Sequence, residues 1–441
     1  MNDYRSVRVA LLGGGTVGAN VAKILLDHSE ELAARVGARL ELTGIAVRNL
    51  DAKRPVDLPA HLFTTDAHEL ILGADIVIEV MGGIEPARTY ILEALNSGAD
   101  VVTANKALLA NHGQELFEAA ERVGAQLYYE AAVAGAIPII RPLRESLAGD
   151  RVERVMGIVN GTTNYILDRM DSEKDSFESA LAMATELGYA EADPTADVDA
   201  FDAAQKASIL ASLAFHTEVP LEAVYREGIR DISAEVVELA RYAGFVIKLL
   251  AIAERVTDAA GNDSVSARVY PALIPREHPL ASVRKANNAV FVQAESAGSL
   301  MFYGAGAGGP ETASAVMGDV VSAARRHIMG GPGLGESKHA NLPLLAINDV
   351  ETSYYVVLRV SDQPGVLATV ASVFHEYNVS VELVEQGIFA PQTGQASKAA
   401  TTTLVIGTHE ARESDLASTV LALSKLPVVD SVVSVLRVEG A

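Results

Sequence analysis

The sequence contains no cysteine. Disulfide bonds, thiolate metal sites and cysteine nucleophiles are therefore excluded for this chain. It also has no apolar stretch that approaches the ~20 residues of a membrane span. Its first residues lack the basic start, the apolar run and the cleavage site of a signal peptide. We therefore expect a protein of the cytoplasm that has no membrane partner.

Basic residues are scarce relative to acidic ones. The chain of 441 residues has 35 lysines and arginines against 57 aspartates and glutamates, which gives a formal net charge of −22. Nucleic acids and anionic membranes bind positive surfaces, so this balance argues against both as partners. The negative net charge does not exclude an anionic small molecule as a ligand, because one local basic cluster is enough to bind it.

The length indicates several domains, since one hydrophobic core rarely serves so long a chain. In the first third, short apolar strands alternate with helical patterns, the strands lying at 7–12, 40–47, 74–80, 100–103 and 127–130. Such alternation predicts an α/β domain with a Rossmann-type, doubly wound parallel sheet over residues 1–150.

The remainder of the chain divides into two further parts. Residues 151–330 mix strand and helix patterns, and we interpret them as an α+β substrate-binding and dimerisation domain. A helix at 311–328 is expected to pack back on the first domain. Residues 331–352 are rich in glycine and proline and are interpreted as a linker. Residues 353–441 follow the order strand, helix, strand, strand, helix, strand, which predicts a ferredoxin-like domain.

A glycine-rich turn joins the first strand to the first helix. Gly13, Gly15 and Gly18 match the G-x-G-x-x-G pattern, and Thr16 and Val17 lie between them where the helix opens. The first glycine permits a tight turn, the second lets phosphates approach the backbone, and the third lets helix and strand pack closely. The helix N-terminus offers free N–H groups to a pyrophosphate. We therefore predict dinucleotide binding; the alternative is a glycine turn without a ligand.

The end of the second strand bears on which dinucleotide is bound. An acidic residue there binds the ribose hydroxyls of NAD, whereas an arginine accepts the 2′-phosphate of NADP. This strand ends in Val47-Arg48-Asn49 with no acid at its tip. Arg48 therefore favours NADP, with NAD still possible. The alternative is that Arg48 is an ordinary solvated surface charge.

Thr103-Ala104-Asn105-Lys106 follows the fourth strand directly. In an open parallel sheet, ligands bind beyond the carboxyl ends of the strands. We therefore expect Thr103 to contact the cofactor and Lys106 to lie near both the nicotinamide and the substrate. The alternative for Lys106 is an exposed lysine at the start of a helix.

A second cluster runs from Glu130 through small residues to Pro138. Its turn can point several carbonyl oxygens inward, and a carboxylate with carbonyls suits an alkali or alkaline-earth cation better than zinc. Taken alone, these residues fit a plain transition from strand to loop better than a cation site.

A third cluster combines acids with a lysine. Residues 188–194 read Gly-Tyr-Ala-Glu-Ala-Asp-Pro, and Asp202 and Lys206 follow on a predicted helix at 201–215. Being four residues apart, these two side chains share one helix face, so the carboxylate can orient the ammonium. A partly desolvated lysine can give a proton to a developing alkoxide, and acids here can bind the amino group of an amino-acid substrate. An exposed, salt-bridged helix is the alternative.

At these clusters the sequence closely resembles the homoserine dehydrogenase family, and the resemblance extends over the whole chain. Residues 160–167, Asn-Gly-Thr-Thr-Asn-Tyr-Ile-Leu, resemble the family's NGTxNyil segment. Residues 188–194 with Asp202 and Lys206 resemble its GyAExDP…D…D…K signature. The glycines of residues 304–308 resemble a late glycine loop that touches the cofactor from the substrate domain.

The resemblance implies interconversion of L-aspartate 4-semialdehyde and L-homoserine with NAD(P)H, in threonine, methionine and isoleucine biosynthesis. Lys206 would be the catalytic acid, Glu191 and Asp202 would bind substrate, and Lys106 would take part at the junction of cofactor and substrate. Gly188 and Gly306 would line the cofactor. The absence of cysteine agrees, because direct hydride transfer between aldehyde and alcohol needs no covalent step.

The resemblance also implies a cation site. Glu130, with the backbone of Val133, Gly135 and Ile137, would hold a monovalent cation, usually sodium. From the residues alone, the cation stays unassigned.

The last domain contains Asp362-Gln363-Pro364-Gly365-Val366-Leu367 between a strand and a helix. This resembles the D-x-P-G-x-L turn of ACT regulatory domains, which pair side by side and bind amino acids at their interface. The resemblance implies L-threonine as a feedback effector and a homodimer or homotetramer. A dimerisation module without a ligand is the alternative.

Two rival functions are open at this point. One is a regulatory protein that senses dinucleotides and amino acids without turnover, although Glu191, Asp202 and Lys206 argue against it. The other is a different dehydrogenase of amino-acid metabolism that acts on a related substrate.

Overall fold

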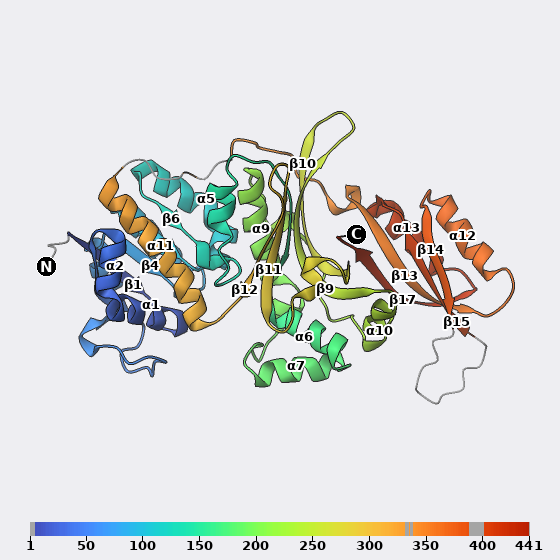
Figure 1. Cartoon of the computed structure of the whole chain (residues 1–441), viewed down its shortest axis with the longest axis horizontal. Coiled ribbons are helices and arrows are strands. Elements are labelled where there is room, and N and C mark those ends of the chain that lie inside the picture. Colours follow the sequence, from blue (N-terminus) through green and yellow to red (C-terminus); the bar gives the residue numbers. More distant parts are fainter. Residues whose placement is uncertain (1–4, 331–334, 336–337, 388–400, 441) are drawn as a thin grey trace.

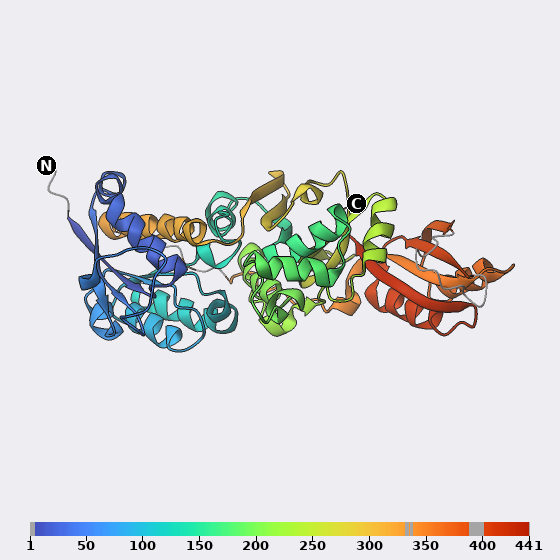
Figure 2. The same ribbon diagram turned by 90° about the horizontal axis from the view of Figure 1, so that it is seen from below.

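The computed structural model describes residues 5–330, 335, 338–387 and 401–440. Figures 1 and 2 show an elongated molecule with three parts in a row: a parallel sheet with helices, a central mixed sheet, and a C-terminal part. Part of the expected linker, at 331–334 and 336–337, lies outside the described residues. Within the described ranges, no helix combines the length and the apolar character needed to cross a bilayer.

The first part is a doubly wound sheet of six parallel strands in the order β3-β2-β1-β4-β5-β6, as predicted. Its strands are apolar and buried because helices cover both faces. The elements in chain order are β1 (Ser6–Leu12), α1 (Thr16–Asp27), α2 (Ser29–Val36), β2 (Arg39–Ala46), β3 (Phe63–Thr64), α3 (Ala67–Leu72), β4 (Ile76–Glu79), α4 (Ala87–Asn96), β5 (Asp100–Thr103), α5 (Lys106–Val123) and β6 (Leu127–Tyr128).

The middle part places helices against an antiparallel group of strands. Its elements are β7 (Val152–Ile158), α6 (Gly161–Ser172), α7 (Phe177–Glu186), α8 (Thr195–Val198), α9 (Phe201–Phe215), β8 (Tyr225–Arg226), α10 (Ala234–Tyr242), β9 (Phe245–Thr257), β10 (Asp263–Pro275), β11 (Asn287–Ala294), β12 (Gly298–Ala305) and α11 (Gly309–Met329). Helix α11 returns to the first part, where Val316 and Val320 share a core with Val21 and Ile76.

The C-terminal part has the predicted ferredoxin-like order, β17-β13-β15-β14. Its elements are β13 (Glu351–Ser361), α12 (Val366–Glu376), β14 (Val381–Gly387), β15 (Thr401–Thr408), β16 (Ala411–Arg412), α13 (Glu413–Leu423) and β17 (Val429–Val438). The sheet is continuous with that of the middle part, because β17 pairs with β10 at Ala272↔Arg437 and Leu273↔Val438.

Candidate active site

A cavity of about 840 Å³ lies where the first and middle parts meet. Eight of the residues singled out from the sequence line it: Val17, Lys106, Gly135, Gly188, Glu191, Asp202, Lys206 and Gly306. The remaining ones are outside its lining: Gly13, Gly15, Thr16, Gly18, Arg48, Thr103, Glu130, Val133 and Ile137. The fold thus brings residues far apart in the sequence to one opening at the carboxyl ends of the parallel strands.

Asp202 is the centre of this site. Its Oδ2 lies 2.7 Å from Lys206 Nζ, one turn further along α9, and its Oδ1 lies 2.9 Å from Lys106 Nζ at the start of α5. Lys206 also donates a 2.6 Å hydrogen bond to the carbonyl of Val159. Asp202 and Lys206 are both only 8% exposed, so the pair is not the exposed helical ion pair considered above.

Asn160 fixes Asp202 from the side of the middle domain. Its amide donates to Asp202 Oδ2 at 2.9 Å and to Asp197 Oδ1 at 2.7 Å. Its side-chain oxygen accepts from Thr163 N and caps α6. Sequence reasoning did not assign Asn160 to the site, and its only signal was its place at the head of the NGTTN segment.

The charges of the site give its two lysines different acidities. Burial lowers the pKa of Lys206, and the neighbouring ammonium of Lys106 lowers it further. The negative charge of Asp202 raises this pKa, but the lowering effects are the larger ones. Burial also opposes the charge of Lys106, but Asp202, Asp197 and Glu191 raise its pKa. Although burial opposes ionisation of Asp202, the two lysines hold its pKa far below the usual range. Lys206 is therefore the more acidic lysine.

The glycine turn has the shape that a pyrophosphate requires. Gly13 has φ +110°, and a Cβ there would lie 2.9 Å from the carbonyl oxygen of Val80. A Cβ on Gly18 would lie 1.9 Å from the carbonyl oxygen of Gly13, so only glycine permits this packing. At Gly15 the space is open, and this residue precedes α1 without a side-chain cap. The first N–H groups of α1 are thus left for a ligand.

Arg48 lies exposed just beyond β2 and has no ion-pair partner among the described residues. Arg54 is held differently: its guanidinium donates to the carbonyls of Asn49, Leu50 and Ala52. Arg48 thus stays available to a ligand at this strand end.

Thr103 is completely buried, and its hydroxyl donates to Glu79 at 2.7 Å while accepting from Asn105 N at 3.0 Å. Glu79 also accepts from Met81 N at 2.7 Å. The hydroxyl of Thr103 therefore shapes the turn that presents Lys106. Sequence reasoning missed Glu79, because a buried acid at a strand end has no local pattern.

The loop after β6 holds the residues of the expected cation site. The Glu130 carboxylate accepts from the backbone N–H groups of Ile139, Ile140 and Arg141 at 2.6, 2.8 and 3.0 Å, so it is engaged in folding the following turn. No described N–H donates to the carbonyls of Val133, Gly135 or Ile137. These three carbonyl oxygens are thus available to a cation. The described ranges hold no cluster of three or more acids and histidines that would suit a metal.

Gly135 connects this loop to the late glycine loop. A Cβ on Gly135 would lie 2.4 Å from the carbonyl oxygen of Gly306, and Ala136 N donates to Ala305 O at 3.1 Å. The two loops therefore touch backbone to backbone beside the cavity.

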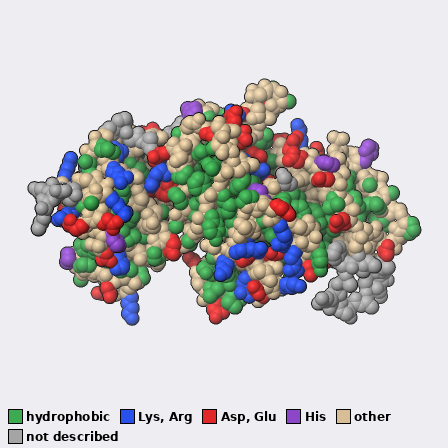
Figure 3. Space-filling model, in the orientation of Figure 1, with side chains coloured by type: hydrophobic (Ala, Val, Ile, Leu, Met, Phe, Trp, Pro, Cys, Tyr) green, Lys and Arg blue, Asp and Glu red, His purple; other side chains and the backbone are tan. Residues whose placement is uncertain are grey.

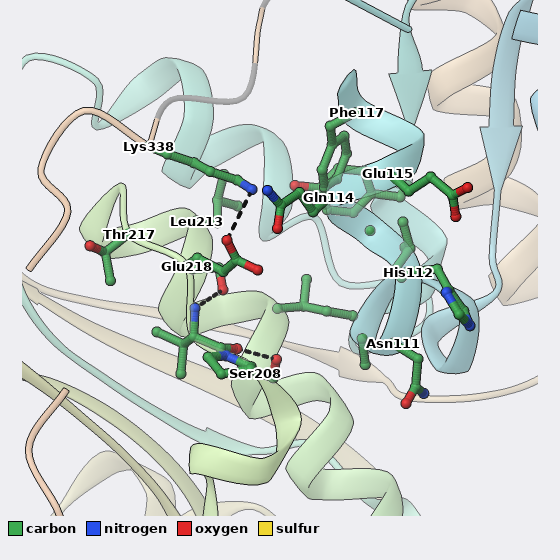
Figure 4. A pocket seen from close by; sticks show the side chains of 18 of the residues that line it. Asn111, His112, Gln114, Glu115, Phe117, Ser208, Leu213, Thr217, Glu218 and Lys338 are labelled. Carbon is green, nitrogen blue, oxygen red and sulfur yellow. Dashed lines mark hydrogen bonds and ion pairs between the residues drawn. The ribbon is translucent and has the colours of Figure 1, made fainter. Parts of the chain in front are cut away.

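A second cavity, of about 400 Å³, lies between later turns of α5 and α9 and is shown in Figure 4. His112 and Gln114 of α5, Ser208 and Leu213 of α9, and Lys338 are among the residues that line it. None of the residues predicted for the site line this second cavity, so the chemistry belongs to the first.

Known proteins of one family resemble the chain along its length. Family models match at residues 13–130 ("Homoserine dehydrogenase, NAD binding domain"), 138–321 ("Homoserine dehydrogenase") and 354–428 ("ACT domain"). The homoserine dehydrogenase of Mycobacterium tuberculosis is 54% identical over 440 residues, covering 99% of both chains. That of Corynebacterium glutamicum is 52% identical over 436 residues, covering 98% of this chain and 96% of the relative.

Solved structures of homoserine dehydrogenases also resemble the chain in fold. The homoserine dehydrogenase from Thiobacillus denitrificans superposes with a TM-score of 0.89 at 37% identity, covering 99% of this chain and 98% of the other. A hyperthermophilic archaeal homoserine dehydrogenase in complex with NADPH superposes with a TM-score of 0.61 at 28% identity, covering 75% of this chain and 99% of the other.

Proposed function

Because the chain belongs to the homoserine dehydrogenase family, NAD(P)-dependent oxidoreductases that act on a CH–OH group, we propose that it reduces L-aspartate 4-semialdehyde to L-homoserine. The observation that carries this proposal is the pair of lysines held by Asp202 at the opening between the cofactor domain and the middle domain. The reaction would serve threonine, methionine and isoleucine biosynthesis.

The proposed chemistry is one hydride and one proton added across the aldehyde C=O bond. A bound nicotinamide cofactor supplies the hydride to the aldehyde carbon. Lys206 gives its proton to the aldehyde oxygen as the alcohol forms, a role supported by the burial that makes this lysine more acidic than usual. Asp202 stays ionised throughout and keeps both lysine side chains oriented.

The amino group of the substrate would bind the acids of the cavity, with Glu191 and Asp202 as its partners. Glu191 is exposed on the cavity wall and Asp202 lies at its buried end. Lys106 would lie between cofactor and substrate, where it is tied to Asp202.

We propose NADP as the preferred cofactor, with NAD as a weaker substitute. Support comes from Arg48, which is exposed, free of ion pairs among the described residues, and positioned at the strand end next to the glycine turn. The glycines of this turn, with Gly188 and Gly306 across the cavity, would line the dinucleotide.

We propose a sodium ion on the carbonyl oxygens of Glu130, Val133, Gly135 and Ile137. The absence of N–H donors to the last three carbonyls within the described residues supports it. The ion would stabilise the loop that packs on Gly306. Thermal unfolding in sodium chloride against choline chloride tests this: a higher midpoint in sodium is expected, and equal midpoints would refute the site.

The two outer strands of the large sheet, β12 and β14, bear on how copies of the chain assemble. The outer strand β12 belongs to a surface on which hydrophobic side chains gather in Figure 3, and Tyr303 on it is 56% exposed. At the other edge of the sheet, β14 exposes Leu383 and Val384. Unpaired strand edges with apolar side chains favour pairing with a second copy. We therefore propose a homodimer or homotetramer, with L-threonine binding to paired ACT domains.

The decisive assay follows the oxidation of NADPH on addition of L-aspartate 4-semialdehyde to the full chain. Turnover is expected. NADPH binding without turnover of any aldehyde would favour a sensor, and turnover of a different aldehyde alone would favour another dehydrogenase. Threonine added to the same assay is expected to slow the reaction.

A further inference from the structure

The last strand of the chain leaves the ACT domain and returns to the middle domain. The end of β17 therefore lies beside the central sheet and not at the far end of the molecule (Figure 1). Here β17 pairs with β10, and Glu439 N donates to Leu273 O at 2.9 Å. The ACT domain is thus joined to the middle domain by a continuous sheet.

Arg437, on this strand, holds carboxylates from both domains. Its Nε and Nη2 bind the two oxygens of Glu413 on α13, at 2.8 and 2.9 Å. Its Nη1 lies 2.9 Å from Glu227 of the middle domain. Arg437 itself is 7% exposed and Glu413 4%, so the pair of charge-assisted bonds between them is shielded from water. The Glu227 side chain is 37% exposed.

Glu227 belongs to the segment 225–230, which packs on the corner between α8 and α9. Ile229 N donates to Val198 O at 2.8 Å, and a Cβ on Gly228 would lie 2.3 Å from the same oxygen. The segment is therefore pressed backbone to backbone against the end of α8.

Two arginines of the segment hold the same corner. Arg226 donates to Asp199 O at 2.9 Å and lies 3.4 Å above the ring of Phe201. Arg230 binds the Asp199 carboxylate through Nε at 2.5 Å and Nη2 at 3.2 Å. Between Asp199 and Phe201, Ala200 has φ +63°, a conformation that side chains rarely adopt. The corner thus depends on its neighbours for its shape.

This corner carries two acids of the active site. Asp197 lies in α8 and Asp202 in the first turn of α9, and Asn160 binds both. Asn160 holds them from the side of the cavity, and the segment 225–230 holds the corner that joins them.

We infer that Glu227 and Arg437 are positioning residues for the substrate site, and that the segment 225–230 transmits changes in the ACT domain to Asp197 and Asp202. The regulatory half of this inference rests on the proposed function. Within the described residues, no hydrogen bond or ion pair joins the segment to the glycine turn at 13–18. The segment acts through the acids that the proposed function assigns to the amino group of the substrate, so we expect its main effect on substrate binding.

The chain offers a matched control. Arg359 on β13 forms a 2.6 Å ion pair with Glu235 on α10, which joins the same two domains. The main contacts of α10 with other elements are with α6 and β9. Glu235→Gln thus removes the carboxylate of a second ion pair between the two domains, one that lies outside the segment 225–230.

The experiment compares Glu227→Gln and Glu235→Gln in the full chain. Glu227→Gln is expected to raise the KM for aspartate semialdehyde about fivefold or more, the usual lower range of coupling between sites, and to leave the KM for NADPH unchanged. Glu235→Gln is expected to change neither. Equal behaviour of the two variants, or an equal rise in both KM values for Glu227→Gln, would overturn the inference.

Two further measurements keep the outcome clear. Arg437→Lys keeps the charge but cannot bind two carboxylates in a planar fork, so the same selective rise in KM is expected. When Glu227→Gln is combined with Arg230→Met, the KM for the aldehyde is expected to rise by less than the product of the two single increases, because both residues act on one corner. Strictly multiplicative effects would contradict a shared route.

The wild-type assay separates this inference from the proposed function. If the wild type does not reduce aspartate semialdehyde, the proposed function fails. If it does and the two glutamine variants are alike, only the positioning role fails. Threonine inhibition is expected to weaken in Glu227→Gln and to persist in Glu235→Gln; equal inhibition of both would refute the transmitted signal.

Discussion

Lys106 and Asp202 come from different domains, and Lys106 Nζ lies 2.9 Å from Asp202 Oδ1. Lys106 is the first residue of α5, directly after a strand of the dinucleotide-binding sheet, whereas Asp202 is in the first turn of α9. The second oxygen of Asp202 binds Lys206. One carboxylate therefore links the cofactor side of the cavity to the proposed proton donor.

Asp202→Asn is expected to lower kcat/KM for the aldehyde by about 10²-fold or more, because two ammonium groups lose the charge that orients them. Binding of NADPH, followed by its fluorescence, is expected to stay near the wild-type value. A kcat/KM within the wild-type range would contradict the central role of this carboxylate.

The alkaline limb of the pH–rate profile reports on Lys206. Reduction needs the protonated lysine, so kcat falls as pH rises through its pKa. Because burial lowers that pKa, the limb is expected below the value of an ordinary lysine, about 10.4. Asp202→Asn removes a charge that raises this pKa, and Lys106→Met removes one that lowers it. The alkaline limb is thus expected to move to lower pH in Asp202→Asn and to higher pH in Lys106→Met. A shift in the same direction in both variants would refute the assignment of the limb to Lys206.

Arg48→Ala tests the cofactor preference. If Arg48 binds the 2′-phosphate, its loss is expected to raise the KM for NADPH by about tenfold, in keeping with a hydrogen bond to a charged group. The KM for NADH, which has no 2′-phosphate, is expected to stay unchanged. Equal effects on the two cofactors would show that Arg48 is an ordinary surface charge.

Lys248 gives a stability prediction. It is 2% exposed, it donates to Asn164 Oδ1 at 2.9 Å and to Val283 O at 2.6 Å, and burial lowers its pKa to about 8. Above this pH the folded protein releases a proton that the unfolded chain keeps until about pH 10.4. The folded state therefore gains stability as pH rises, by about 1.4 kcal/mol per unit within that window.

Urea unfolding of the wild type and of Lys248→Met, at about pH 7.5 and about pH 9.5, measures this change in stability with pH. Both pH values lie below about pH 10, where the tyrosines of the unfolded chain titrate. The stability of the wild type relative to the variant is expected to rise between the two. A difference independent of pH would show that Lys248 titrates normally.

Local patterns were enough to predict much of the fold. The glycine turn and α9 follow from short-range spacing, and both lie where the sequence predicts them. The sequence patterns did not reveal β3, because a strand of two residues has no alternation, and α2, β9 and β12 were not assigned. Long-range partners also escaped prediction: Asn160 meets Asp202 across 42 residues, and only folding brings Arg437 to Glu227.

The Glu130 carboxylate illustrates the same limit at the site. As an acid among small residues it suggests a ligand for a cation, yet the fold directs it to three N–H groups that follow it in the chain. Which oxygen of a residue faces a ligand depends on the conformation of the whole loop, and composition does not determine it.

The most direct test of the account is the turnover of Lys206→Ala with NADPH and L-aspartate 4-semialdehyde, measured beside its affinity for NADPH. If Lys206 is the proton donor, turnover is expected to fall by about 10²- to 10⁴-fold while NADPH still binds. Turnover close to that of the wild type would contradict the role of Lys206 and the mechanism built on it.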